Sequence, residues 1–303
     1  MEKRVASYSL GSSQRDKTVD VQLNGHSFHI SRQGFNGNLS ALAQAIAACP
    51  PEIDVLTLGG IDFELEFLHR SFPFRDAKRL RAAAHHQPLV DGANFKRWVE
   101  PMFFRQIFQQ GTILPRGKVF FPLGANRLFL AAEMARCGFS EIVFGDLIYN
   151  VGFPPYLIKG IPQYTMIGTI AGRLVANLPF AWIYPAGEGA EPATPRLKQA
   201  RHFYDAEIIA GDYHSIHRFL PHNLGGKTIV TNTVTAEDVT SMRQKGVSTL
   251  VTFASGLDGR IFGANVWDGI VTAYLREHAL PGDQENYLHA VQALGLAPSC
   301  TCL

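Results

Sequence analysis

Cysteine is scarce in this sequence, with four residues among 303. A small secreted fold held together by disulfides needs a denser set, so this class of protein is excluded. Cys49 and Cys137 lie in apolar helical contexts, which is typical of small core residues. Cys300 and Cys302 are candidate ligands for a soft metal, but terminal residues are usually poorly ordered, and we assign this tail no role.

The sequence has no large excess of either charge. It contains 28 Lys and Arg residues and 26 Asp and Glu residues, for a net charge of +2. We therefore expect no nucleic-acid partner. Residues 1–7 are charged but show no apolar segment of a secretory signal. The most membrane-like window, residues 166–184, is interrupted by Arg173, Asn177 and Pro179. We expect a cytoplasmic protein without membrane contact, whose partner is a small molecule.

Strand and helix patterns alternate along the whole chain. Such alternation predicts an α/β protein with a mainly parallel sheet. Early in the chain, apolar and polar residues alternate around an Asn24-Gly25 hairpin turn. Six strands are expected after residue 117: Val119–Phe121, Glu141–Phe144, Phe180–Tyr184, Glu207–Ala210, Thr228–Thr231 and Thr249–Thr252. The helix between the last two strands is well marked, because Thr235 can cap it with Asp238 three residues on.

Six parallel strands are what two mononucleotide-binding halves require. We predict an α/β substrate-type domain over residues 1–115 and a Rossmann-like doubly wound domain over 116–262. A returning helix and the C-terminal tail would occupy 263–303. Two earlier strands, 54–58 and 88–90, raise the count to eight, so a β/α barrel is the alternative. The irregular gaps and the early hairpin favour two domains.

The segment from Lys118 to Asp146 is the most informative for function. It predicts a buried strand, a turn at Gly124, a helix, and a second strand that ends in a carboxylate. In dinucleotide-binding folds such a turn meets the pyrophosphate, and an acid about 20 residues later binds the ribose. One glycine stands where the fingerprint has three. The candidate cofactor-binding residues here are Gly124, Ala125, Asn126, Arg127 and Asp146, and the acid favours NAD over NADP.

Other strands also end in polar residues. Thr231 and Asn232 follow one strand and are further cofactor-binding candidates, because ligands of open α/β sheets lie at the carboxyl ends of the strands. Asp212 follows another, and His214 and His217 come next on one helix face. They could serve as acid and base or hold a metal, although a surface or helix-capping role is the better explanation of these residues. We predict no resident metal and name His214 as a proton-transfer candidate.

The loop after the first strand carries hydroxyls and cations. Ser12 and Ser13 could bond the oxygens of a carboxylate or polyol, and Arg15 could offset its charge. The alternative is a solvated loop. Both interpretations fit the residues.

In the order of these features the chain resembles the quinate/shikimate dehydrogenase family, and quinate 5-dehydrogenases in particular. Three segments carry the resemblance: Tyr8–Ser13 matches the substrate-holding Ser-x-Ser loop, Leu89–Lys96 the Asn-Thr-Asp segment, and Ile261–Gly269 the start of the returning helix. The resemblance implies a substrate role for Ser12, Ser13 and Asn94. It also implies a cleft between two domains and a nicotinamide-dependent oxidation of a small hydroxylated carboxylate.

The catalytic Lys and Asp of that family are not found at the matching positions of this sequence. Its Lys has no counterpart after Leu58, where Gly59–Phe63 stands, and its Asp falls on Lys96. We therefore name Lys96 and Asp91 as catalytic candidates, with Asp62 as another acid that could supply the chemistry.

Three functional hypotheses follow. The first is an NAD-dependent oxidoreductase, with NADP as a second choice of cofactor. The second is a non-catalytic binding or regulatory protein that keeps the cleft. The third is a metal-assisted enzyme centred on Asp212, His214 and His217. A homodimer is left open.

Overall fold

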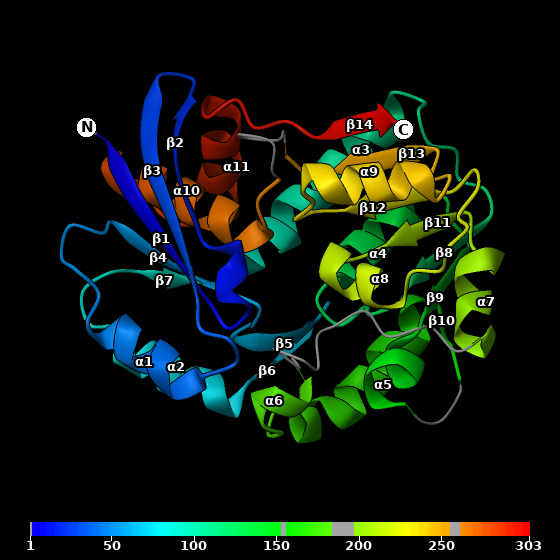
Figure 1. Ribbon diagram of the computed structural model, residues 1–303, viewed down its shortest axis with the longest axis horizontal. Helices are drawn as coiled ribbons and strands as arrows, with labels where there is room; N and C mark the ends of the chain where they lie inside the picture. The colour runs from blue at the N-terminus through cyan, green and yellow to red at the C-terminus, as the bar shows by residue number, and fades with distance from the viewer. Residues whose placement is uncertain (1, 153–155, 184–196, 255–260) are drawn as a thin grey trace.

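The computed structural model describes residues 2–152, 156–183, 197–254 and 261–303. Figure 1 shows two lobes side by side, each with one β-sheet at its centre. The first lobe combines the N-terminal strands with helices from the end of the chain. The second lobe holds the strands that follow residue 117. A single apolar core cluster contains residues of both sheets, for example Val55 in the first and Val119 in the second.

The sheet of the first lobe has five strands in the order β2-β3-β1-β4-β7. Four of them are parallel, and β2 pairs antiparallel with β3. The predicted turn joins β2 to β3: Asn24 and Gly25 both have positive φ, as a two-residue hairpin of this kind requires. The strands are β1 (Lys3–Ser9), β2 (Lys17–Leu23), β3 (His26–Gly34), β4 (Val55–Gly59) and β7 (Leu89–Val90).

Helices cover this sheet. In Figure 1, α1 (Leu39–Ala47) and α2 (Arg75–Ala83) lie below it, and α10 (Ala264–Glu277) and α11 (Gln284–Ala293) lie on its upper side. The helix α10 packs directly on β1 and β4. Gly269 allows this approach, because a Cβ there would overlap side-chain atoms of Thr57 and Val5. A separate hairpin of β5 (Glu64–Phe67) and β6 (Arg70–Pro73) extends from this lobe toward α5.

The second sheet has seven strands in the order β10-β9-β8-β11-β12-β13-β14. The five central strands are parallel, and the short edge strands β10 and β14 are antiparallel to their neighbours. The order reverses between β8 and β11, which is the switch point where ligands of doubly wound sheets bind. The strands are β8 (Lys118–Phe121), β9 (Glu141–Phe144), β10 (Ile158–Lys159), β11 (Ile208–Ala210), β12 (Thr228–Thr231), β13 (Thr249–Thr252) and β14 (Ser299–Cys302).

The connections of the second lobe are mostly helical. The predicted capping box of α9 is present, with Thr235 and Asp238 bonding each other's backbone amides. The remaining elements are the 3₁₀ turn η1 (Ser13–Arg15), the π-helical turns η2 (Phe95–Val99) and η3 (Leu147–Val151), and the helices α3 (Glu100–Gln109), α4 (Leu128–Arg136), α5 (Gly160–Val175), α6 (Phe180–Ile183), α7 (Leu197–Asp205), α8 (Tyr213–Phe219) and α9 (Ala236–Gln244).

Three expectations from the sequence are wrong. The strand predicted at Phe180–Tyr184 is the short helix α6, and Tyr184 lies outside the described residues. A short apolar run does not distinguish a strand from a buried helical turn, and here the Phe180 amide donates to Asp76 at 3.0 Å. The doubly wound sheet consequently has five parallel strands rather than six. Two separate sheets also exclude the β/α barrel. The tail at Cys300 and Cys302, expected to be poorly ordered, forms β14 against β13.

Candidate functional site

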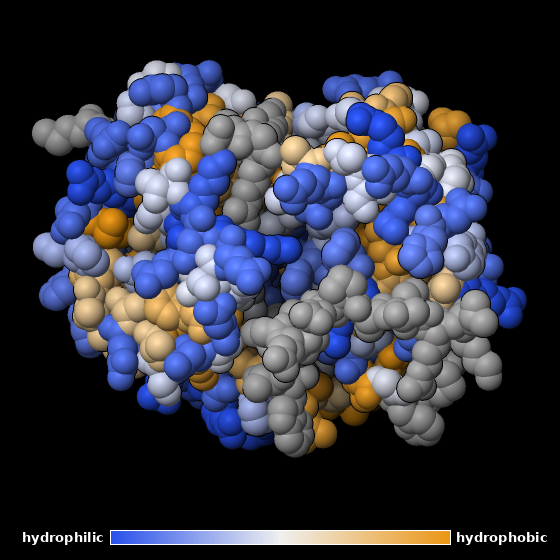
Figure 2. Space-filling view, in the orientation of Figure 1, coloured by the Kyte–Doolittle hydropathy of each residue, from blue (hydrophilic) through white to orange (hydrophobic). Residues whose placement is uncertain are grey.

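The strongest candidate site is a polar cavity of about 500 Å³ at the junction of the two lobes. Figure 2 shows hydrophilic side chains along the gap between the lobes. The first lobe contributes the residues that follow β4 and β7, and the second lobe contributes the turn between β8 and α4. The lining residues that matter most are Asp62, Glu66, Asp91, Asn94, Lys96, Arg97 and Asn126, with Asp268 behind them.

A buried ion pair joins Lys96 of η2 to Asp62, which follows β4. Both side chains are about nine-tenths buried, at 11% and 10% exposure. Burial alone would lower the pKa of Lys96, but the carboxylates of Asp62 and Asp91 outweigh it and raise this pKa. Lys96 therefore keeps its proton at neutral pH. A fixed ammonium beside a carboxylate is suited to proton transfer at a substrate hydroxyl.

Asp91 lines the same cavity as Lys96 and is held by the backbone. Its carboxylate accepts the amides of Phe63 at 2.6 Å and Ala93 at 3.1 Å. Burial raises the pKa of Asp91, while the Lys96 charge opposes that rise. Both carboxylate oxygens accept backbone donors, and the charge of Asp91 helps to raise the pKa of Lys96.

The remaining polar groups of the cavity are arranged as pairs. Asn126 of the second lobe donates to Asp62 at 3.5 Å, a long bond that brings the β8–α4 turn to the ion pair. Arg97 pairs with Glu66, whose pKa is raised by burial. The Nε atom of Arg97 is buried without a hydrogen-bond partner. It is a donor that a ligand oxygen could satisfy.

Asp268 closes the back of the cavity from α10. Its carboxylate accepts the Tyr287 hydroxyl at 2.7 Å and the Gly92 amide at 3.0 Å. Burial raises the pKa of Asp268 to about 7, and the nearby charge of Asp91 adds to the rise. The returning helix thus ties the linker between the lobes to the wall of the cavity.

The switch point itself is filled by the Arg127 side chain. This buried guanidinium lies between Glu100, at 3.5 Å, and Asp212, at 3.3 Å. Glu100 is fully buried and also accepts the side-chain amide of Asn232 at 3.0 Å. Thr231 donates to the Gly211 carbonyl at 2.7 Å. The predicted cofactor residues Arg127, Thr231 and Asn232 therefore meet at one place, where they bond protein groups.

Asp146 and Gly124 are brought together as predicted, but they bond each other. The carboxylate of Asp146 accepts the Gly124 amide at 3.0 Å and the Tyr164 hydroxyl at 3.0 Å. Burial raises the pKa of Asp146 to about 6 against the hydrogen bonds from Gly124, Tyr164 and Ala125 that lower it. The amides of this turn are thus already matched with an internal carboxylate. A pyrophosphate bound at this turn would have to displace the Asp146 carboxylate from the Gly124 amide.

The predicted substrate loop lies apart from the cavity lining. Ser12 accepts the Gln14 amide at 3.2 Å as the cap of η1, and Ser13 accepts the Asn36 side chain at 3.0 Å. Burial lowers the pKa of His214, the carboxylate of Asp212 opposes this shift, and the charge of Arg15 adds to it. Of the predicted substrate and catalytic residues, the structure places Asn94, Asp91 and Lys96 in the cavity. Ser12, Ser13, Arg15 and His214 are not among its lining residues.

The charged residues of the cavity that escaped prediction include Asp268, Glu66 and Arg97. Asp268 is an acid within the apolar sequence Ala-Asn-Val-Trp-Asp-Gly-Ile-Val, and an acid on the buried face of a helix is a usable signal. Glu66 and its partner Arg97 gave no local signal, because they lie 31 residues apart in the sequence.

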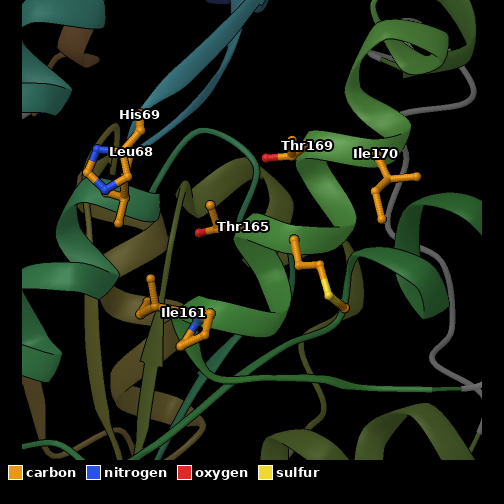
Figure 3. Close-up of a pocket in the computed structure, with 8 residues that line it drawn as sticks. Leu68, His69, Ile161, Thr165, Thr169 and Ile170 are labelled. Carbon is orange, nitrogen blue, oxygen red and sulfur yellow. The ribbon is translucent and has the colours of Figure 1, made fainter.

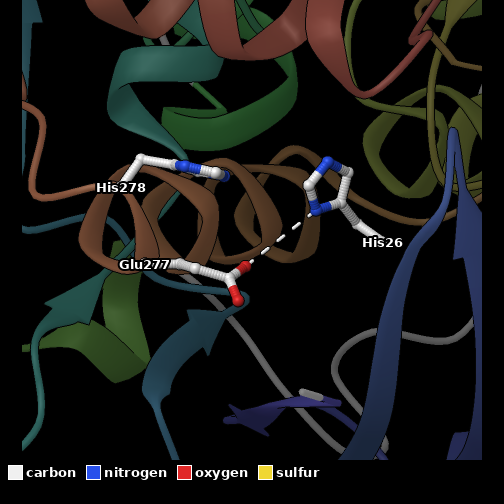
Figure 4. A group of neighbouring side chains, drawn as sticks. All are labelled: His26, Glu277 and His278. Atoms are coloured by element: carbon white, nitrogen blue, oxygen red, sulfur yellow. Dashed lines mark ion pairs between the residues drawn. The ribbon is translucent and has the colours of Figure 1, made fainter.

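The proposed ligand triad of the metal-assisted hypothesis does not form a metal-binding group. Asp212 caps α8 by accepting the His214 amide at 3.2 Å, and its carboxylate also meets Arg127. Within the described ranges of the chain, the one group with metal-ligand spacing is His26, Glu277 and His278 (Figure 4). These residues were not predicted from the sequence.

A second hollow of about 440 Å³ lies along α5 (Figure 3). Its lining is mainly apolar, with Leu68, Ile161, Met166 and Ile170 around the hydroxyl of Thr165. It lacks the paired charges of the first cavity and offers little for chemistry. None of the helices in the described part of the chain is long and apolar enough to cross a membrane.

The fold and the cavity define an α/β protein with two sheets and a polar site at their junction. Residues 94–303 match the family described as domain of unknown function DUF8754, and residues 4–91 match the family described as DUF8753. The first match covers more than half of the chain, so the protein belongs to the DUF8754 family. The two matches meet at Gly92 and Ala93, between β7 and η2. No curated protein matches the sequence.

Several solved structures are distantly similar. One is a solute-binding protein of an ABC transporter from Agrobacterium vitis, bound with α-D-tagatopyranose, at 10% identity and a TM-score of 0.37 over 93% of this chain and 91% of that one. A shikimate 5-dehydrogenase-like protein matches at 10% identity and a TM-score of 0.31 over 97% of both chains. Ornithine carbamoyltransferase from Pyrococcus furiosus matches at 12% identity and 0.30, over 97% and 84%. These likenesses are too distant to assign a ligand or a reaction.

Proposed function

We propose that the protein is an enzyme that acts on a small polyhydroxylated molecule held in the cavity between the lobes. The buried Lys96–Asp62 pair carries this proposal. Asp62 accepts the proton of a substrate hydroxyl, and the Lys96 ammonium stabilises the oxygen as negative charge develops on it. Asn126 and Asn94 line the same cavity and supply amide groups that can orient further hydroxyls.

The charges of the cavity favour an uncharged substrate over the carboxylate that the sequence suggests. Each of its three described cations faces an acid: Arg81 faces Glu64 at 3.7 Å, Lys96 pairs with Asp62, and Arg97 pairs with Glu66. Asp91 and Asp268 add two more carboxyl groups. A substrate carboxylate would enter a site in which acids outnumber cations. We therefore propose a neutral sugar or cyclic polyol.

A nicotinamide dinucleotide is our proposed hydride acceptor, with NAD ahead of NADP because of Asp146. The strand order of the second sheet and the turn at Gly124 support it. Against it stands the internal bond from the Gly124 amide to Asp146, which a bound pyrophosphate would have to replace. Oxidation of a substrate hydroxyl would require such an acceptor, because Asp62 would take the hydroxyl proton while the hydride leaves the carbon for the cofactor.

The test combines binding with turnover. Binding of neutral polyols and sugars, and of quinate and shikimate, is measured by calorimetry, and nicotinamide reduction is followed by absorbance. Asp62→Asn and Lys96→Met should abolish turnover, and circular dichroism checks that each variant is folded under the assay conditions. Lys118→Met is the matched control, because it removes a Lys–Glu pair of 3.1 Å at the outer end of β8. If neither variant differs from the control in binding or turnover, the cavity is not the site.

The second candidate is a non-catalytic binding protein on the same fold. One observation favours it: the amides of Gly124 and Ala125, in the turn before α4, already bond to Asp146. This candidate predicts that a polyol binds while NAD and NADP do not bind at millimolar concentration. That result would remove the oxidoreductase hypothesis and leave the cavity as a binding site.

A further inference from the structure

A second candidate site lies on the outer side of the first lobe, away from the cavity. It consists of three side chains from two distant parts of the sequence: His26 at the start of β3, Glu277 at the end of α10, and His278 directly after it. Figure 4 shows the two imidazole rings and the carboxylate facing a common space. Their candidate ligand atoms all lie within 4.8 Å of one another, and the group is partly exposed to solvent.

The chemistry of these groups is that of a divalent transition-metal site. Two imidazole nitrogens and one carboxylate oxygen form the ligand set of many zinc sites with an open fourth position. Nδ1 of His26 lies 3.9 Å from Oε2 of Glu277, which is too long for a hydrogen bond. Zinc bonds of about 2.1 Å place tetrahedral ligands about 3.4 Å apart. Small side-chain rotations are therefore sufficient to close the site around an ion.

Neighbouring contacts fix the relative positions of the three candidate ligands. The ring of Tyr274 lies 5.0 Å from that of His26 and 4.3 Å from that of His278, centre to centre. On the hairpin side, the Asn24 side chain donates to the Ala293 carbonyl of α11 at 3.0 Å. The β2–β3 hairpin is thus anchored to the helical layer close to His26. The ligands do not depend on a loop for their relative placement.

Among the described residues, the cation of Lys3 competes for the carboxylate of Glu277. The ammonium of Lys3 lies 3.3 Å from Oε1 of Glu277. In the absence of a metal this cation offsets the charge of Glu277. A metal ion would repel it or share the carboxylate with it, so Lys3 should weaken metal binding.

We propose that His26, Glu277 and His278 bind one divalent transition-metal ion of the zinc class, and that Lys3 limits its affinity. The bound ion would join the β2–β3 hairpin to the end of α10 and stabilise the first lobe. This site is independent of the proposed catalytic cavity, because it shares no residue with it.

The test titrates Zn²⁺ into the full chain by calorimetry and repeats the titration with Co²⁺, whose absorption spectrum reports the ligands. A Cys300→Ser/Cys302→Ser background removes the other soft ligands near the C-terminus. We expect one equivalent of metal, at least a tenfold loss of affinity in His26→Ala and in His278→Ala, and no change in His289→Ala, which alters an exposed histidine of α11. Lys3→Met should tighten binding several-fold.

Lys3→Met separates metal binding from folding defects, because a damaged fold would not increase the affinity for Zn²⁺. Thermal unfolding with and without Zn²⁺ gives a second readout, in which the shift in Tm should vanish in His26→Ala. The proposal is overturned if Zn²⁺ fails to bind at millimolar concentration. It is equally overturned if binding survives in His26→Ala, or if Lys3→Met leaves affinity unchanged.

Discussion

The carboxylate of Asp146 accepts the backbone amide of Gly124 at 3.0 Å, at the turn where dinucleotide-binding folds hold a pyrophosphate. The chain therefore supplies its own anion to this turn. The same carboxylate also holds Tyr164 of α5, so it joins three elements of the second lobe. If Asp146 binds a cofactor, its removal should lower NAD affinity. If its role is structural, its removal should lower the free energy of unfolding.

Asp146→Ala should destabilise the protein by about 1–3 kcal/mol, because the Gly124 amide and the Tyr164 hydroxyl lose their acceptor. Urea unfolding measures this change, and Tyr164→Phe serves as a milder control that keeps the carboxylate. NAD affinity is then measured by calorimetry. If Asp146→Ala leaves a measurable NAD affinity unchanged, Asp146 does not bind the ribose.

Arg127→Met should be strongly destabilising, by about 3–5 kcal/mol, because it leaves the fully buried Glu100 without its main countercharge. Adding Glu100→Gln should restore at least half of that loss, since the buried charge is then absent. A double-mutant cycle in urea measures the coupling. Additive effects of the two substitutions would show that the pair is not coupled.

The pH dependence of stability should carry the signature of Asp268. Its folded pKa of about 7 lies above its ordinary value of 3.8, so the folded state holds this proton more tightly. The contribution of Asp268 to the free energy of unfolding is fully present below pH 4 and is lost as the pH rises to about 7. The loss is on the order of 4 kcal/mol. Asp146, with a pKa of about 6, acts in the same direction.

Asp268→Asn can keep both hydrogen bonds, accepting from Gly92 and donating to the Tyr287 oxygen, but it cannot titrate. We expect the difference in unfolding free energy between this variant and the wild type to change steadily from pH 4 to pH 7. Denaturant unfolding at several pH values measures it. A difference that is independent of pH would show that Asp268 is ionised throughout this range.

Gly168→Ala should disturb the contact between α5 and the β5–β6 hairpin. A Cβ at this position would overlap the ring of Phe67, and overpacking of this kind costs about 1–3 kcal/mol. Gly282→Ala is the control, because a Cβ there has nothing within 4 Å. Phe67→Leu should relieve part of the effect in the double variant. Equal stability of the two alanine variants would contradict the observed packing.

Local patterns predicted much of the fold. The strands β8, β9, β12 and β13 are short apolar runs bounded by turn residues, and the Asn24-Gly25 turn and the Thr235 capping box depend on neighbours in the sequence. The strand predicted at the α6 segment was wrong because a short apolar run is compatible with both a strand and a buried helical turn. The edge strand β14 failed because it exists only through pairing with β13, which the sequence of the tail does not encode locally.

The candidate site was less accessible to sequence reasoning. Lys96 and Asp91 could be named because the segment Leu89–Lys96 resembles the Asn-Thr-Asp segment of the quinate/shikimate dehydrogenase family. The ion pair itself joins residues 34 positions apart, and its desolvation results from packing of the two lobes. Arg127 was expected to face a phosphate, but the side chain instead turns inward to Glu100. Such choices depend on buried charges contributed by other elements.

The return of α10 to the first lobe has a consequence during synthesis on the ribosome. All five strands of the first sheet are translated before residue 91. One face of β1 and β4 stays uncovered until α10, which contains Gly269, has been translated. The parallel strands of the second sheet are complete by Thr252, before α10 is translated. The nascent N-terminal sheet therefore exposes apolar surface while the later sheet is already forming, and this interval is when chaperone binding or aggregation would occur.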